Sequence, residues 1–119
     1  GTPDMKLPIR YALTYPYRAA TPDKPLDLLS CGPLTFSAPD EEAFPCLRIA
    51  KDCAAAGGTA CAIMNGANEV AVAQFLRGEI GFNDIARRVE RALSRVAVKY
   101  QPSLGDILEA DRLGREAAR

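Results

Sequence analysis

The sequence predicts a mainly α-helical fold: an antiparallel four-helix bundle preceded by a proline-rich extended arm. Eight of the nine prolines lie at or before Pro45, and from Ala43 onward apolar residues recur at three- and four-residue intervals. Because proline breaks helix interiors, the proline-rich part cannot form a regular helical domain. We therefore divide the chain into an arm, residues 1–40, and a helical domain, residues 41–119.

The arm is expected to hold one short helix and two short strand pieces. Residues 7–15 suit two helical turns, since Pro8 is tolerated in a first turn and Pro16 ends the helix. Residues 26–28 and 34–36 have a strand-like composition. Pieces this short cannot form a sheet alone, so the arm is expected to lie against something else.

The first two helices of the domain have clear start and stop residues. The first is expected to open at Phe44-Pro45 and to end at Gly57-Gly58, because glycine favours the position after a helix C-terminus. The second begins either at Thr59 or at Asn65, since both are good N-caps, and it ends near Gly78.

The last two helices are expected on either side of Pro102. One begins with Asn83 as its N-cap and runs through Tyr100, and the other follows a capping box at Ser103 and Asp106. Across the four helices, the apolar residues expected to face inward are Cys46, Leu47, Ile49, Ala50, Cys53, Ala54, Ala67, Val70, Ala71, Phe75, Ile85, Val89, Leu93, Val96, Tyr100, Leu104, Ile107 and Leu108. Amphipathic helices joined by short loops are typical of an antiparallel bundle.

Composition excludes several functions. Fifteen basic and fifteen acidic residues give no net charge, so general binding to nucleic acid or to an anionic membrane is not expected. The absence of histidine excludes Ser-His-Asp, Cys-His and His-ligated zinc sites. We expect a cytoplasmic protein, because there is no signal peptide and no apolar run of about 18 residues. The start at Gly1, without an initiator methionine, is typical of a cut fragment or a processed product.

The four cysteines do not suggest a metal site. Cys31, Cys46, Cys53 and Cys61 are each at least seven residues apart, whereas structural zinc sites use close pairs. Cys46 and Cys53 would share one helix face. We expect all four to be reduced and to pack in the core as small hydrophobic residues.

Two polar clusters allow both a functional and a structural interpretation. Arg87, Arg91, Arg95 and Lys99 recur every four residues; they are either a phosphate or nucleic-acid surface or a solvated helix face, and the second is favoured, with Asp84 pairing to Arg88. Residues 65–69 carry two amides and a carboxylate. One glutamate is too little for magnesium, so we expect Asn65 to cap a helix while Asn68 and Glu69 hydrogen-bond the arm.

The ordered set of short segments is more specific than any one of them. The segments are Gly1-Thr2-Pro3-Asp4-Met5, Pro8-Ile9, Tyr15-Pro16-x-Arg18, Lys24-Pro25-Leu26-Asp27, Leu34-Thr35-Phe36-x-Ala38-Pro39-Asp40, Pro45-Cys46-Leu47, Asn65-x-Ala67-Asn68-Glu69, Ala73-x-Phe75-Leu76, Phe82-x-Asp84-Ile85, Asp111 and Arg115-Glu116. Together they resemble the C-terminal part of the 1-deoxy-D-xylulose 5-phosphate reductoisomerase family, over essentially the whole chain.

The resemblance implies an enzyme of isoprenoid biosynthesis. Family members rearrange 1-deoxy-D-xylulose 5-phosphate and reduce the product with NADPH to 2-C-methyl-D-erythritol 4-phosphate, using magnesium or manganese. They are homodimers with a dinucleotide-binding domain, a catalytic domain, a linker and a helical C-terminal domain. By this resemblance, residues 1–40 are the end of the catalytic domain and the linker, and residues 41–119 are the C-terminal bundle.

The resemblance also assigns roles within the chain. Met5 matches a family methionine near the nicotinamide pocket, so it is the one candidate cofactor-binding residue. No catalytic residue, metal ligand or cofactor of its own is expected in the fragment, which would be structural. Its partner would be the rest of its own chain, with no nucleic acid and no membrane involved. The alternative is a free-standing helical interaction module whose arm adds to a partner.

Overall fold

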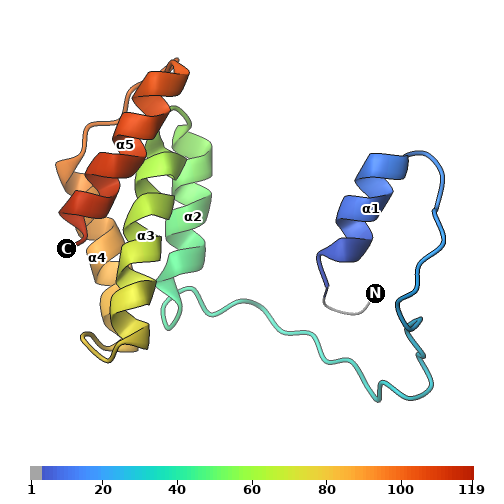
Figure 1. Ribbon diagram of the computed structural model, residues 1–119. Helices are drawn as coiled ribbons and strands as arrows, with labels where there is room; N and C mark the ends of the chain where they lie inside the picture. Colours follow the sequence, from blue (N-terminus) through green and yellow to red (C-terminus); the bar gives the residue numbers. More distant parts are fainter. Residues whose placement is uncertain (1–3) are drawn as a thin grey trace. The chain divides into compact units, whose positions relative to one another are not determined.

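The computed structural model describes residues 4–119, and five helices make up the regular secondary structure of that range (Figure 1). They are α1 (Lys6–Thr14), α2 (Pro45–Ala56), α3 (Ala60–Leu76), α4 (Phe82–Arg95) and α5 (Leu104–Ala117). The mainly α-helical prediction is confirmed. Gly1 to Pro3, where the family resemblance begins, lie outside the described residues.

The strand pieces predicted at 26–28 and 34–36 are wrong, because no strand occurs within residues 4–119. Asp27 instead closes a turn. Its side-chain Oδ1 accepts a hydrogen bond from the Leu29 amide at 3.0 Å, and its carbonyl accepts one from the Ser30 amide at 3.3 Å. An aspartate that hydrogen-bonds the backbone two residues later favours a turn over an extended strand.

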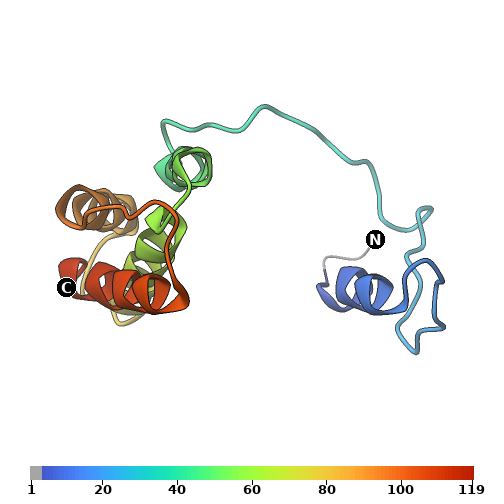
Figure 2. The same cartoon turned by 90° about the horizontal axis from the view of Figure 1, so that it is seen from above.

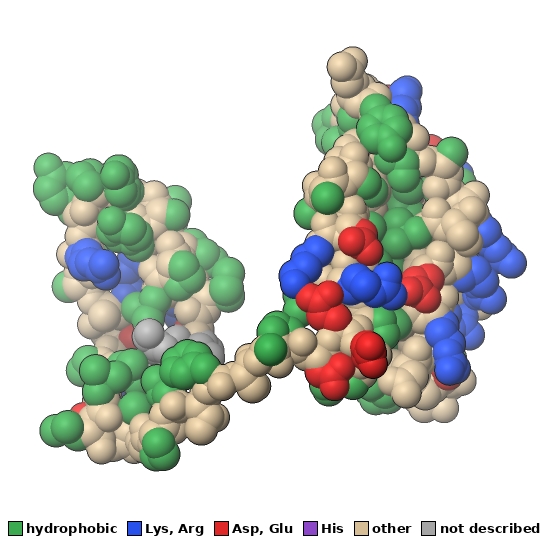
Figure 3. All heavy atoms as spheres, turned by 180° about the vertical axis from the view of Figure 1, so that it is seen from behind, with side chains coloured by type: hydrophobic (Ala, Val, Ile, Leu, Met, Phe, Trp, Pro, Cys, Tyr) green, Lys and Arg blue, Asp and Glu red, His purple; other side chains and the backbone are tan. Residues whose placement is uncertain are grey.

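The chain divides into two compact units, an N-terminal unit, Gly1–Ala38, and a C-terminal unit, Pro39–Arg119. The N-terminal unit contains α1 and the segment that follows it. No residue between 4 and 38 is buried, and hydrophobic side chains cover much of the surface of this unit in Figure 3. Leu29 and Phe36 are 98% and 90% exposed, so this unit has no core of its own.

The C-terminal unit is organised around α3, which contacts α2, α4 and α5 (Figure 2). Its core is one cluster of small and branched side chains that all come from this unit. The buried members are Ile49, Cys53, Ala60, Ile63, Ala67, Ala86, Val89, Ala92, Ala110 and Ala118. Ile63 and Val89 are the largest hydrophobic side chains that are fully buried.

Small residues allow α3 and α5 to approach closely. A Cβ added to Gly114 would lie 2.5 Å from the Ile63 carbonyl oxygen, and one added to Gly66 would lie 2.6 Å from the Asp111 carbonyl oxygen. The face of α5 that packs inward is therefore the one with Ala110 and Gly114.

Several residues predicted to face inward are exposed. Leu104, Ile107 and Leu108 are 72%, 38% and 63% exposed, because the small-residue face of α5 takes their place. On α2, Cys46, Leu47 and Ala54 are exposed, while Ile49 and Cys53 are buried as predicted.

Near the end of α3, Phe75 is 37% exposed and joins an aromatic cluster with Phe44 and Phe82. The Phe75 and Phe82 rings pack edge to face, with centroids 5.8 Å apart. Phe75 therefore contributes to a half-exposed cluster rather than to the core.

The turn between α2 and α3 is pinned to the segment after α4. Thr59, 1% exposed, donates its amide to the Lys99 carbonyl at 3.1 Å, and its Oγ1 accepts the Lys99 amide at 3.0 Å. Because the amide and carbonyl of Lys99 hydrogen-bond Thr59, they are not available for helical hydrogen bonds, and α4 ends at Arg95. The predicted continuation to Tyr100 is wrong, and Tyr100 is 68% exposed.

The helix starts agree in part with the predictions. Thr59, and not Asn65, precedes α3, and the capping box of α5 is confirmed: Ser103 Oγ accepts from the Asp106 amide, and Asp106 Oδ2 accepts from the Ser103 amide. The predicted Asn83 cap is wrong. Gly81 precedes α4 and donates its amide to Asp84 Oδ2 at 3.0 Å, which leaves Asn83 inside the first turn.

All four cysteines are free thiols, but only Cys53 is buried, so the prediction of four core cysteines is wrong. Cys31 lies in the N-terminal unit, which has no core, and Cys46 and Cys61 lie on outward helix faces. Burial raises the pKa of the Cys53 thiol, with smaller contributions from Cys61 and Asp52.

Candidate functional site

Met5, the candidate cofactor-binding residue, lies directly before α1. It is the N-cap residue of that helix, and its side chain is 70% exposed. The Met5 carbonyl accepts a hydrogen bond from the Ile9 amide at 3.2 Å, so the backbone is fixed while the thioether is free to contact another group. An exposed, polarizable thioether suits contact with an aromatic ring.

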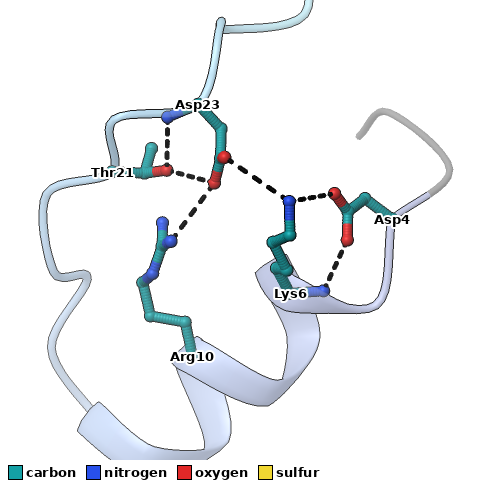
Figure 4. A network of polar contacts seen from close by, with 5 residues as sticks. All are labelled: Asp4, Lys6, Arg10, Thr21 and Asp23. Carbon is teal, nitrogen blue, oxygen red and sulfur yellow. Dashed lines mark hydrogen bonds and ion pairs between the residues drawn. The ribbon is translucent and has the colours of Figure 1, made fainter.

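A polar network holds the start of α1 to the segment that returns past it (Figure 4). Arg10 Nη2 lies 3.2 Å from Asp23 Oδ2, and Lys6 Nζ lies 4.0 Å from Asp23 Oδ1 and 3.3 Å from Asp4 Oδ2. Thr21 Oγ1 donates to Asp23 Oδ2 at 2.6 Å and accepts the Asp23 amide at 3.0 Å. Asp23 is therefore the centre of this network.

The electrostatics of the network favour a charged Asp23. The hydrogen bond from Thr21 lowers the pKa of the Asp23 carboxyl most, followed by the hydrogen bond from Arg10 and the charge of Lys6. A carboxylate that accepts several donors stays ionised over a wider pH range. The network therefore positions Lys6 and Arg10 on one side of α1.

The cluster at residues 65–69 links two helices, and it contains no helix cap. Asn65 lies inside α3, where its Nδ2 donates to Glu69 Oε1 at 3.1 Å. Glu69 Oε2 lies 2.7 Å from Arg115 Nη2, and Arg115 Nε lies 2.7 Å from Asp111 Oδ2. Arg115 holds the pKa of Glu69 below its usual range, with help from Asn65.

This geometry corrects the predicted role of the cluster. Asn65 was expected to cap a helix, and Asn68 and Glu69 to hydrogen-bond the arm. Thr59 takes the place before α3, so the predicted Asn65 cap is wrong. Glu69 pairs with Arg115 of α5, and the hydrogen bonds from Asn68 and Glu69 to the arm stay a prediction. The cluster instead fixes the crossing of α3 and α5 beside Gly66.

The basic residues of α4 and of the segment after it are exposed, as both interpretations require. Arg87, Arg91, Arg95 and Lys99 are all exposed. Asp84 pairs with Arg87 at 2.9 Å, and not with Arg88 as predicted. Arg88 donates to the carbonyls of Ala118 and Arg119, at 2.6 and 2.8 Å, which ties α4 to the end of α5.

The part of the chain that the structure describes contains neither a metal-binding cluster nor a membrane-spanning helix. Within residues 4–119, no three His, Cys, Asp or Glu side chains come together as a metal ion would require. None of the helices in that range is long and apolar enough to cross a membrane.

Sequence reasoning missed the ion pairs of both polar networks. Arg10 and Asp23 are thirteen residues apart across a segment without periodicity, so no sequence pattern could pair them. Asp111 and Arg115 are four apart on α5, a spacing that predicts an ion pair. Glu69 reaches that pair only through the crossing of two helices.

Comparison with known proteins identifies the family. The sequence model described as "DXP reductoisomerase C-terminal domain" matches residues 1–117, nearly the whole chain. The chain belongs to this family. Its helices α2 to α5 and the unit that contains α1 all fall within the matched range.

The curated relatives are longer proteins named 1-deoxy-D-xylulose 5-phosphate reductoisomerase. The chain is 49% identical over 118 residues to 1-deoxy-D-xylulose 5-phosphate reductoisomerase of Pseudomonas paraeruginosa, covering 99% of the chain and 30% of the relative. It is 51% identical over 115 residues to that of Synechococcus sp., covering 97% and 29%. The chain thus spans about 30% of the length of the curated relatives it matches.

The chain is also similar to solved structures of 1-deoxy-D-xylulose 5-phosphate reductoisomerases. The Zymomonas mobilis enzyme in complex with NADPH is 42% identical, with a TM-score of 0.84, over 99% of this chain and 31% of that one. A DOX-P reductoisomerase in complex with NADPH, fosmidomycin and magnesium is 39% identical, with a TM-score of 0.82, over 99% and 31%.

Proposed function

We propose that this chain is the C-terminal part of a 1-deoxy-D-xylulose 5-phosphate reductoisomerase. The complete enzyme would convert 1-deoxy-D-xylulose 5-phosphate to 2-C-methyl-D-erythritol 4-phosphate with NADPH and magnesium or manganese. The observation that carries this proposal is the family match over residues 1–117, at about half identity to relatives more than three times as long.

Within that enzyme, the chain would have a structural role. Residues 1–40 would be the end of the catalytic domain and the linker arm, and residues 41–119 an antiparallel four-helix C-terminal bundle. Support comes from the two units that divide between Ala38 and Pro39, and from the core, which lies entirely in the second unit. The exposed apolar residues of the first unit would be covered by the rest of the catalytic domain.

The divalent cation and NADPH relate differently to the residues of this chain. The described residues hold no group of side chains suited to a divalent cation, so the metal would be bound by other parts of the enzyme. For NADPH, the candidate contact is Met5, whose side chain is 70% exposed. We propose that Met5 packs against the nicotinamide ring in the complete enzyme and helps to orient it.

The surroundings of the enzyme are part of the same proposal. It would be a cytoplasmic homodimer that uses neither nucleic acid nor a membrane as a partner. The zero net charge, and the acidic and basic side chains that lie together on part of the face in Figure 3, support the absence of a nucleic-acid or membrane partner.

The first experiment compares the protein encoded by the complete reading frame with the purified 119-residue chain. Given 1-deoxy-D-xylulose 5-phosphate and magnesium or manganese, the complete protein should oxidise NADPH, measured as loss of absorbance at the reduced cofactor's maximum, and the short chain should not. Turnover by the short chain would contradict the structural role. A complete protein with no such activity, and a start codon close to Gly1, would favour a free-standing module.

The second experiment tests Met5 in the complete protein. Met5→Ala should raise the KM for NADPH by about tenfold, as expected when an apolar contact worth roughly 1.4 kcal/mol is lost. Met5→Leu should restore most of the affinity, because leucine keeps the apolar volume. Leu13→Ala, a truncation in the helix that Met5 precedes, is the matched control and should leave KM unchanged. An unchanged KM in Met5→Ala would exclude the proposed contact.

A further inference from the structure

The N-terminal unit contains a hollow of about 450 Å³ beside α1 that no proposed role uses. Leu7 and Pro8 form part of its apolar wall, and Arg10, Tyr11, Arg18 and Thr21 form its polar lining. A concave site with an apolar wall and a few convergent polar groups is the usual form of a small-ligand site. The two guanidinium groups indicate which kind of ligand this hollow would accept.

One nitrogen of Arg10 is a buried donor without an acceptor. Nη2 is held by Asp23 at 3.2 Å, whereas Nη1 is shielded from solvent and has no hydrogen-bond partner among residues 4–119. Leaving a buried N–H of a charged group unpaired is unfavourable. A ligand that supplies an oxygen acceptor at Nη1 would remove this cost.

Arg18 brings a second guanidinium to the hollow. Its Cζ lies 5.0 Å from the centre of the Tyr11 ring, a cation–π arrangement that fixes the plane of the group without neutralising its charge. Within residues 4–119, Arg18 forms no ion pair with a carboxylate.

The charge around the hollow is unbalanced. The lining contributes the positive charges of Arg10 and Arg18. The adjoining network in Figure 4 adds one positive charge from Lys6 and two negative charges from Asp4 and Asp23. Both carboxylates are already engaged by Lys6 and Arg10. One positive charge therefore remains for an incoming anion, and guanidinium groups bind carboxylates and phosphates through paired hydrogen bonds.

We propose that this hollow is an oxyanion-binding site, in which Arg10 Nη1 and the Arg18 guanidinium hold a carboxylate or phosphate group. Asp23 and Thr21 are its positioning residues, because Thr21 fixes Asp23 and Asp23 fixes Arg10. The oxyanion has two possible sources. It is either a free anion or a carboxylate side chain from the part of the polypeptide that precedes the C-terminal domain in the longer relatives.

The test begins with the 119-residue chain at constant ionic strength. Inorganic phosphate and acetate are titrated separately while the side-chain ¹⁵N signals of the arginines are followed by NMR. Both anions should shift the Arg10 and Arg18 signals in a saturable way and leave Arg91, an exposed arginine of α4, unshifted. If neither anion causes a saturable shift, or if Arg91 shifts equally, the proposal is overturned.

Three variants locate the binding. Arg10→Gln should raise the Kd for phosphate by about tenfold, because one charge-assisted hydrogen bond is lost. Arg18→Gln should weaken binding in the same direction, and it touches none of the Asp23 contacts, so it remains informative if Arg10→Gln disturbs the unit. Arg91→Gln removes the same charge from the C-terminal unit and should leave the Kd unchanged. If all three variants bind phosphate with the same Kd, the proposed oxyanion site is wrong.

The complete protein distinguishes the two sources. If phosphate shifts Arg10 there as well, the ligand is a free anion. If phosphate has no effect but the Arg10 guanidinium protons exchange with solvent more slowly than in the short chain, the preceding polypeptide supplies the carboxylate. Both results support an oxyanion site. Fast exchange together with no response to phosphate in the complete protein would overturn it.

Discussion

The two units of this chain use opposite means to hold their helices. In the C-terminal unit, α2 to α5 surround fully buried side chains such as Ile63 and Ala92, both 0% exposed. In the N-terminal unit, α1 buries no residue, and the contacts that hold it are ion pairs and hydrogen bonds around Asp23. One unit therefore carries its own core, and the other depends on polar contacts and on cover from outside.

This difference shows where the stability of the chain resides. Helices shorter than about 12 residues are marginal in water, and most helices in proteins are stabilised by packing of an apolar face. α1, with nine residues and exposed apolar side chains, lacks that packing in this chain. Substitutions of apolar residues should therefore have very unequal effects in the two units.

The largest expected effect comes from Ile63→Ala, which removes a fully buried side chain from the centre of α3. The free energy of unfolding, measured by urea denaturation with circular dichroism, should fall by about 2–5 kcal/mol. Leu13→Ala in α1 is the matched truncation at an 82% exposed position and should change it by less than about 0.5 kcal/mol. Similar losses in both variants would break the comparison between the units.

A smaller effect should come from the helix crossing within the C-terminal unit. Gly114→Ala places a methyl group 2.5 Å from the Ile63 carbonyl oxygen, so α3 and α5 must move apart at a cost of about 1–3 kcal/mol. Gly105→Ala on the same helix meets only Ser103 Oγ at 3.8 Å and should be neutral or stabilising by up to about 1 kcal/mol. Equal unfolding midpoints for the two variants would show that the crossing tolerates a larger residue.

The smallest effect should appear at the surface, as a dependence on pH. Lys99 lowers the pKa of Asp106 most, and Ser103 lowers it further, to about 2 from an ordinary value of 3.8. Because the folded pKa lies below the unfolded one, this carboxylate stabilises the fold above pH 3.8, and the stabilisation is lost as the pH falls through about 2.

Asp106→Asn should therefore lower the urea midpoint of unfolding at pH 6. The difference in midpoint between this variant and the wild-type chain should narrow between pH 4 and pH 2. Lys99→Gln removes the largest cause of the lowered pKa, so in that background the narrowing should be smaller and should be complete at a higher pH. A difference that stays constant with pH would mean that Asp106 acts through its shape alone. The result would show how much polar contacts contribute even to the unit that has a core.

Local signals in the sequence predicted the helices well. The prolines before residue 46, the glycines after α2 and the Ser103–Asp106 box each act through their own backbone, so they can be read without knowing the fold. The α4 stripe of Ile85 and Val89 is buried as predicted, because this helix has charged residues on every other side.

Features that depend on two distant segments were not predictable. Gly66 and Gly114 decide which face of α5 packs inward. They do so by allowing α3 and α5 to approach closely, which the hydrophobic periodicity of the sequence does not reveal. The end of α4 is decided by Thr59, 40 residues from Lys99. The same holds for the candidate site, since the contact of Arg10 with Asp23 crosses an irregular segment, and Met5 was named only through the family resemblance.

The double hydrogen bond between Thr59 and Lys99 also limits how the sequence can vary in length. It fixes the number of residues from Thr59 through α3 and α4 to Lys99, since an inserted or deleted residue next to either partner would bring the wrong amide to the Thr59 hydroxyl. Within residues 4–38, no hydrogen bond fixes residues 33–38. Insertions and deletions should therefore be tolerated in that segment, whereas the number of residues between the end of α4 and Lys99 should stay constant.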